Sequence, residues 1–240
     1  MNFIRSIIAM LQFCTVLPLG KPSDYDLFAK RTYLLPVAGY VVGGITALAV
    51  LYMPSVPVTA AVALFLVLIL SGCNHFDGLL DLGDGMMAHG SREKRIAALT
   101  DRQTGAGAVA AGTLVLILSF SGLLSVASIP VAILVSEVLA KMAMSFVITT
   151  GRPFKEGMYA YMHGFVKPWF PAVSLLLCLP LFLLPVSPSA IAIAFIVALG
   201  MVLLMYVNAH RLFGGINGDV VGATNEVTRA VVIIVLSFVL

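Results

Sequence analysis

Three aspartates in the first half of the chain are spaced at the helical repeat. Asp77, Asp81 and Asp84 occupy positions i, i+4 and i+7. At about 100° per residue, their carboxylates fall within roughly 60° of one another on a helix. Like charges on one stripe repel, and Mg²⁺ favours carboxylates that share the rest of its shell with water and substrate phosphates. The spacing therefore predicts a magnesium site, with Asp101 as a further ligand from the next element.

Composition decides between this site and a solvated acidic helix face. The chain has 240 residues, of which 60% are hydrophobic and 10% charged, with a mean hydropathy of +1.07. Soluble domains carry about 25% charged residues, so a polytopic membrane protein is predicted. Four of the eleven acidic residues are the aspartates between positions 77 and 101, and this concentration favours a site. The net charge of +3 gives no reason to expect a nucleic-acid partner.

The charge distribution predicts an all-α integral membrane protein with about six full transmembrane helices in three hairpins. Twelve of the fourteen Lys and Arg residues fall in four long polar segments, and the tight turns between apolar runs carry none. The positive-inside rule places these polar segments in the cytoplasm. The apolar ends 1–17 and 230–240 are short for a span and are predicted as short terminal helices. The polar segments are 18–31, 74–105, 151–168 and 208–229. The predicted spans are Leu34–Met53, Val58–Gly72, Gly105–Val126, Pro130–Thr149, Trp169–Leu184 and Ser189–Val207.

Two further groups of residues are candidates for substrate binding. Glu137 and Lys141 stand at i, i+4 inside a predicted span, where they either pair structurally or leave Lys141 to reach a substrate phosphate. In the last polar segment, glycines follow an arginine, and such glycines let backbone amides approach a phosphate that the arginine binds. The candidate substrate-binding residues are Arg102, Lys141, Arg211, Gly215, Gly218, Asp219, Asn225 and Glu226.

At this point the motifs resemble those of a known family. The run His75-x-Asp-Gly-Leu-x-Asp-x-x-Asp-Gly85, followed by Asp101 and by Gly214-Gly-x-x-Gly-Asp-x-x-Gly-Ala223, is similar to the cobalamin synthase family, the adenosylcobinamide-GDP ribazoletransferases. The resemblance covers nearly the whole chain in order. It implies a Mg²⁺-dependent reaction at the membrane, the last assembly step of adenosylcobalamin. In it α-ribazole, or its 5′-phosphate, attacks the pyrophosphate of adenosylcobinamide-GDP and GMP leaves.

Phosphoryl transfer of this kind needs positioning and charge neutralisation more than covalent catalysis. On this hypothesis Arg102 and Arg211 neutralise the leaving GMP, and His75 or one of the aspartates accepts the proton of the attacking hydroxyl. Residues 1–240 are predicted to form a single catalytic domain in the cytoplasmic membrane, with its active site facing the cytoplasm. Whether copies assemble into a homo-oligomer stays open. The predicted catalytic residues are His75, Asp77, Asp81 and Asp84, and the predicted metal ligands are Asp77, Asp81, Asp84 and Asp101.

Two other functions are weighed against this one. Asp81-Leu-Gly-Asp-Gly-Met-Met-Ala88 resembles the first half of the CDP-alcohol phosphotransferase motif, but the later aspartate pair of that motif has no counterpart here. A divalent-cation transporter would use the aspartates as its ion site. The aspartates are expected at the cytoplasmic end of a span, whereas transporter sites lie near the middle of the bilayer.

Overall fold

The computed structural model describes residues 2–240, and every secondary-structure element in that range is a helix, which confirms the predicted all-α class. The elements are α1 (Asn2–Cys14), α2 (Tyr25–Ala29), η1 (Thr32–Leu34), α3 (Leu35–Val50), α4 (Val56–Leu70), α5 (Asn74–Met87), α6 (Arg92–Leu99), α7 (Ala106–Ser125), α8 (Ile129–Thr150), α9 (Met158–His163), α10 (Phe170–Cys178), η2 (Leu179–Leu183), α11 (Pro188–Phe213) and α12 (Gly218–Val239).

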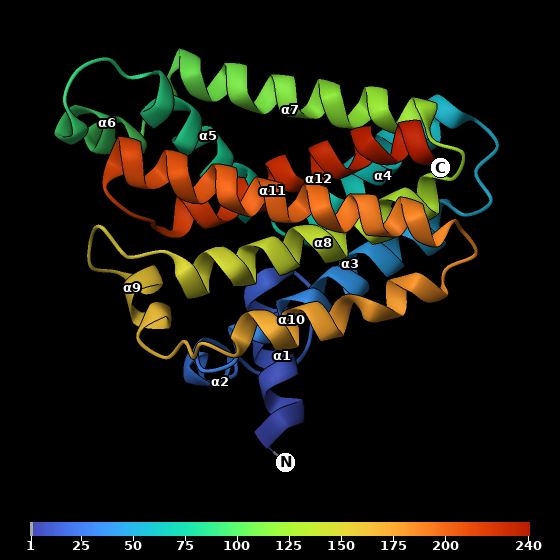
Figure 1. Cartoon of the computed structure of the whole chain (residues 1–240), viewed down its shortest axis with the longest axis horizontal. Coiled ribbons are helices and arrows are strands. Elements are labelled where there is room, and N and C mark those ends of the chain that lie inside the picture. Colours follow the sequence, from blue (N-terminus) through green and yellow to red (C-terminus); the bar gives the residue numbers. More distant parts are fainter. Residues whose placement is uncertain (1) are drawn as a thin grey trace.

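Helices long enough to cross a bilayer run side by side in the bundle (Figure 1). Within residues 2–240, five helices have the necessary length and apolar composition: Thr32–Val50, α7, α8, α11 and α12. The central helix is α8, which packs against α3, α10, α11 and α12 and has 83% of its span buried. The outer helices expose large apolar side chains such as Leu48, Leu114 and Ile196, as expected of a surface that contacts lipid. The chain is therefore a polytopic membrane protein.

The C-terminal part of the sequence-based prediction is wrong. Residues 208–229 do not form a loop, because α11 continues to Phe213 and α12 begins at Gly218. The chain therefore ends with a 22-residue membrane-length helix instead of a short apolar one. Three of the polar residues that suggested a loop lie buried inside the bundle, where Asn225 and Arg229 each donate a hydrogen bond to Glu226.

Two of the predicted spans are shorter than a full crossing. The helix α4 has 15 residues and meets α5 at an angle of 93°, so the pair forms either a broken span or a re-entrant segment. At this bend Cys73 adopts a left-handed conformation with φ of 57°. The helix α10 stops at Cys178 and continues as the 3₁₀ turn η2, which contains Pro180. A count of six spans is reached in the described range only if α4 and α5 are taken together, with α12 in place of the predicted span Trp169–Leu184.

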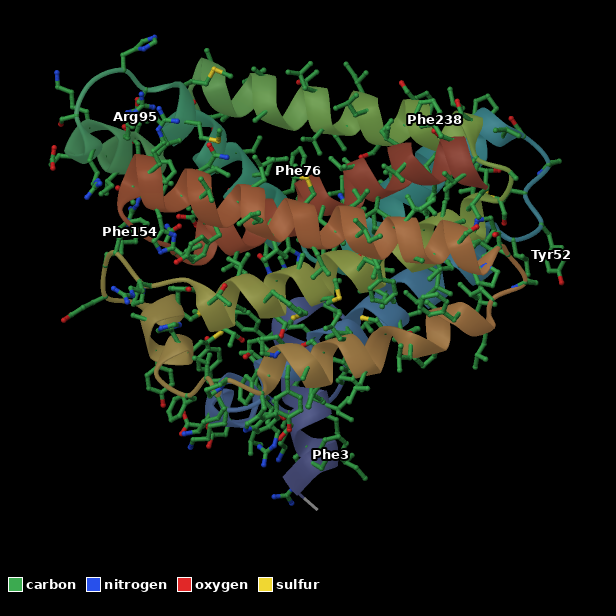
Figure 2. All side chains as sticks on the ribbon, in the orientation of Figure 1. Phe3, Tyr52, Phe76, Arg95, Phe154 and Phe238 are labelled. Carbon is green, nitrogen blue, oxygen red and sulfur yellow. The ribbon has the colours of Figure 1, made fainter. Side chains whose placement is uncertain are left out.

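The two ends of the bundle differ in composition. We call the end formed by residues 88–105, 151–169 and 214–217 the polar end, since it holds most of the charged loops. The three predicted hairpin turns and the C-terminus lie at the opposite end (Figure 1). Figure 2 shows Arg95 and Phe154 at the polar end and Tyr52 and Phe238 at the other. The hairpin arrangement predicted from the charges is therefore present, with α12 as an additional crossing.

Close packing of α3 on α8 depends on a glycine. A Cβ atom on Gly39 would lie 2.6 Å from Val138 Cα and 2.7 Å from the Glu137 carbonyl oxygen, and neither backbone can move aside easily. We expect Gly39→Ala to lower the free energy of unfolding by about 1–3 kcal/mol through overpacking. Gly44→Ala is the matched control, because a Cβ there meets nothing within 4 Å. Thermal unfolding in detergent would measure both, and equal midpoints would show that α3 and α8 adjust without cost.

Candidate active site

A polar cavity of about 390 Å³ opens at the polar end of the bundle. Its walls come from α5, from the segment 99–104 between α6 and α7, from the loop after α8, and from the first turn of α12. Four carboxylates and two cations line it, which leaves an excess of negative charge suited to a cation. The charged lining residues are Asp77, Asp81, Asp101, Arg102, Lys155 and Asp219.

Two glycines set the position of α5 at this cavity. A Cβ on Gly83 would lie 2.6 Å from the carbonyl oxygen of Gly107 in α7, and a Cβ on Gly78 would lie 2.8 Å from the carbonyl oxygen of Asp219 in α12. The backbone of α5 therefore lies close against both neighbouring helices. Asp77 and Asp81, one turn apart, both line the cavity, as the helical spacing predicts.

The environment of Asp81 raises the pKa of its carboxyl group. Asp81 lies on α5, which follows the sharp bend and is not one of the five membrane-length helices. Partial burial, followed by the nearby charges of Asp219, Asp77 and Asp84, raises the pKa of Asp81 to about 6, while Lys155 opposes the shift. These anions make ionisation of Asp81 more costly, so a bound cation would relieve the repulsion.

The carboxylate of Asp84 makes two hydrogen bonds to the start of α7. Its Oδ2 accepts a hydrogen bond of 2.7 Å from the Gly105 N–H, and its Oδ1 accepts one of 2.8 Å from the Ala108 N–H. These donors lie at the N-cap and in the first turn of α7, where the amides have no partner within the helix. Asp84 therefore caps α7 from the neighbouring helix. Within residues 2–240, no three acidic, histidine or cysteine side chains form a metal cluster.

We expect Asp84→Ala to destabilise the fold by about 1 kcal/mol, the usual cost of losing a helix cap. Asp84→Asn retains one acceptor oxygen and should lose less stability, with most of the activity kept. Thermal midpoints and turnover of the two variants would be compared. Loss of turnover in a well-folded Asp84→Asn protein would return Asp84 to the catalytic residues.

The linker 214–217 holds the loop after α8 in place at the cavity. The Ile216 N–H donates to the Arg152 carbonyl oxygen at 2.8 Å, and the Phe154 N–H donates to the Ile216 carbonyl oxygen at 3.3 Å. Gly215 is required for this contact, since a Cβ there would collide with the Arg152 carbonyl oxygen. This short bridge holds the segment that carries Lys155 next to the start of α12. Packing alone therefore requires a glycine at position 215.

Asp219 is held at the N-terminus of α12. The Asn217 side chain caps this helix by accepting from the Val220 N–H at 3.1 Å, and its Nδ2 donates to Asp219 Oδ2 at 2.5 Å. Asp219 Oδ1 has no hydrogen-bond partner among residues 2–240. Among the candidates in the last polar segment, Asp219 lines the cavity, whereas Arg211 is exposed on the last turn of α11 and does not.

Lys141, Asn225 and Glu226 lie inside the bundle, away from the polar cavity. Lys141 Nζ donates to Asn225 Oδ1 at 2.7 Å and lies 3.8 Å from Glu137 Oε2. Arg229 Nη1 donates to Glu137 Oε1 at 3.0 Å and to Glu226 Oε1 at 3.1 Å, and its Nη2 also pairs with Glu226. We call these five residues the buried ion network. This geometry favours a structural pairing of Lys141 with Glu137 over a contact between Lys141 and a substrate phosphate.

His75 is also separated from the aspartates. It is 6% exposed on the first turn of α5 and lines a second cavity, which is described below. Its position two residues before Asp77 turns it to another face of the helix. The sequence proximity of His75 and Asp77 therefore did not indicate a shared site.

Comparison with known proteins agrees with this arrangement of motifs. The sequence profile of the cobalamin-5-phosphate synthase family matches residues 6–237. The chain belongs to this family. It is 32% identical to the adenosylcobinamide-GDP ribazoletransferase of Methanocella arvoryzae, with 100% of this chain and 97% of the relative covered. It is 33% identical to the protein of that name from Pyrococcus abyssi, with 95% and 96% covered. No solved structure matches the chain.

As a member of the cobalamin-5-phosphate synthase family, the chain is an enzyme, a transferase of cobalamin biosynthesis. Two residues that matter to its structure were not among the predicted site residues. Lys155 lines the polar cavity, whereas in the sequence it is a basic residue of the loop 151–168 that fits an interfacial anchor, with a contact to an anionic ligand as the alternative. Arg229 is buried at the centre of the buried ion network, although it was placed in a loop.

Proposed function

We propose that this enzyme transfers the cobinamide-phosphate group of adenosylcobinamide-GDP to α-ribazole or its 5′-phosphate. A ribose hydroxyl attacks the phosphorus attached to cobinamide, the bond to GMP breaks, and a phosphodiester forms. The names of the relatives support the substrates. The observation that carries the proposal is the polar cavity, in which Asp77, Asp81 and Asp219 face Lys155 and Arg102.

The donor set of the cavity fits Mg²⁺. This ion usually keeps several waters and is bound by one or two carboxylates together with substrate phosphates, so a ready-made protein cluster is not required. Asp77 and Asp81, one turn apart on α5, would hold it, with Asp101 in the wall formed by the segment 99–104. When bound, Mg²⁺ neutralises charge on the pyrophosphate and on the leaving phosphate.

The remaining charged groups of the cavity divide the other tasks between them. Lys155 and Arg102 bind phosphate oxygens and offset the charge of the departing GMP. Asp219, whose Oδ1 has no partner among residues 2–240, accepts the proton of the attacking hydroxyl. The hydrogen bond from Asn217 to the other oxygen keeps this carboxylate in place.

The polar end is proposed to face the cytoplasm, with the protein in the cytoplasmic membrane. Seven of the fourteen Lys and Arg residues lie in the segments 88–105 and 151–169 at this end, and the turns at the opposite end carry none. Water-soluble nucleotide substrates would reach the cavity directly from that side. The same position argues against a transporter, because the aspartates lie at one end of the bundle rather than midway along it.

The test is the release of GMP by the purified protein in detergent, given adenosylcobinamide-GDP, α-ribazole and Mg²⁺. GMP should form only when the acceptor is present, and chelation of Mg²⁺ should abolish its formation. A folded protein that releases no GMP under these conditions, but releases CMP from a CDP-alcohol, would replace the proposal with the phosphotransferase alternative.

A further inference from the structure

A second cavity of about 320 Å³ lies beside the polar one. It is enclosed by α1, α2, α3, α8 and α9 and by the first turns of α5 and α12. Its volume is within the usual range of about 300–1,000 Å³ for small-molecule sites. Its wall is mainly apolar and aromatic, and none of its lining residues is charged. The lining residues include Phe13, Phe28, Met144, Tyr159 and Met162.

The aromatic side of this cavity is already ordered. Phe13 and Phe28 stack with ring centroids 4.7 Å apart and an interplanar angle of 29°. The Tyr159 hydroxyl donates to the Gly151 carbonyl oxygen at 2.8 Å, which fixes the ring in the wall. Flat aromatic ligands gain from contact with such rings, since aromatic pairs contribute beyond their buried area. Met158, 57% exposed on α9, marks the rim toward solvent.

A polar group in this wall lacks a partner. Neither ring nitrogen of His75 is hydrogen-bonded to any group in residues 2–240, and its Nδ1 is fully buried. A buried polar atom without a hydrogen bond is costly, and native proteins usually satisfy it. Asn74 stands next to it in the same wall. The cavity thus combines a flat apolar surface with one place for a polar ring atom.

The two cavities share a border at residues that are adjacent in sequence. Asn74 and His75 line the apolar cavity while Asp77 lines the polar one, and Gly218 lines the apolar cavity while Asp219 lines the polar one. A Cβ on Gly218 would meet nothing within 4 Å, so open space lies beside the backbone at this point. A ligand with one end in the apolar cavity reaches Asp219 by extending past Gly218.

We propose that the apolar cavity binds the aromatic base of the acceptor nucleoside, with its ribose directed past Gly218 toward Asp219. The inference rests on the proposed function and assigns one substrate of that reaction to a place. An uncharged bicyclic base with few polar ring atoms matches the wall. The corrinoid and the guanine of the other substrate carry many amide or polar ring groups, which would remain unpaired here.

The test measures specificity between two acceptors. Met162→Trp fills the cavity, and the ratio of kcat/KM for α-ribazole over the riboside of unsubstituted benzimidazole should fall about tenfold or more. The KM for adenosylcobinamide-GDP should stay within twofold. Met205→Trp is the matched control, because Met205 is similarly buried but lines a separate apolar cavity between α5, α7, α11 and α12. Since the measurement is a ratio, partial loss of folded protein does not change it.

An unchanged ratio in Met162→Trp, or a rise in the KM for adenosylcobinamide-GDP instead, would overturn the inference. Equilibrium binding of α-ribazole without the second substrate tests the same cavity separately from turnover. Weaker binding by Met162→Trp than by Met205→Trp supports the cavity even if the wild type releases no GMP, in which case the proposed function alone fails. Equal binding by both variants rejects the cavity while leaving the reaction intact.

Discussion

Asp81→Asn is expected to reduce the rate of GMP release by about 10²-fold or more, the scale seen when one preorganised electrostatic group is removed from a site. The substitution keeps the shape of the side chain and removes the negative charge that would bind Mg²⁺. The pKa of Asp81 is raised to about 6 by burial and by the neighbouring carboxylates, so its ionised form costs stability above that pH. The neutral variant should therefore be at least as stable as the wild type at pH 7.

This separation of activity from stability is the measurement that decides the role of Asp81. Turnover and thermal midpoint would be determined on the same preparation, with Glu156→Gln as control. Glu156 is exposed on the loop that carries Lys155, but it does not line the polar cavity. Unchanged turnover in Asp81→Asn would remove the aspartate stripe from the reaction, and lost turnover with a lowered midpoint would indicate a structural role.

The part of the site that was predictable is the part encoded by local spacing. Asp77 and Asp81 share a face because the helical repeat places positions i and i+4 together, and this holds whatever packs around them. Asp84 has the right spacing as well, yet its direction depends on the start of α7, whose free amides attract it. Spacing alone contains no information about that neighbour.

Residues contributed by other segments could not be placed from the sequence. Lys155 reaches the cavity because Ile216 pairs with the loop after α8. The paired positions are some 60 residues apart in the chain, and no periodic sequence pattern indicates such a contact. The C-terminal helix was missed for a related reason. Polar residues such as Glu226 and Arg229 lowered the hydropathy of α12, but Arg229 pairs with Glu137 on α8 and Glu226 pairs with Arg229, so neither faces solvent.

The buried ion network gives the largest expected effect on stability. It contains two cations, Lys141 and Arg229, and two anions, Glu137 and Glu226, and all four side chains are at most 1% exposed. Arg229 hydrogen-bonds to both carboxylates and so joins α8 to α12. Replacing Arg229 with leucine would leave these two carboxylates without their shared partner. Such uncompensated buried charge typically costs about 3–5 kcal/mol.

We therefore expect Arg229→Leu to lower the thermal midpoint in detergent strongly or to prevent accumulation of folded protein. Arg211→Leu is the matched control, since Arg211 is exposed, and exposed substitutions usually stay within about 0.5 kcal/mol. Adding Glu226→Leu to Arg229→Leu removes one of the stranded anions and should recover part of the loss, because the two side chains are in direct contact. If the double variant is no more stable than the single one, the cost arises from lost packing and not from unpaired charge.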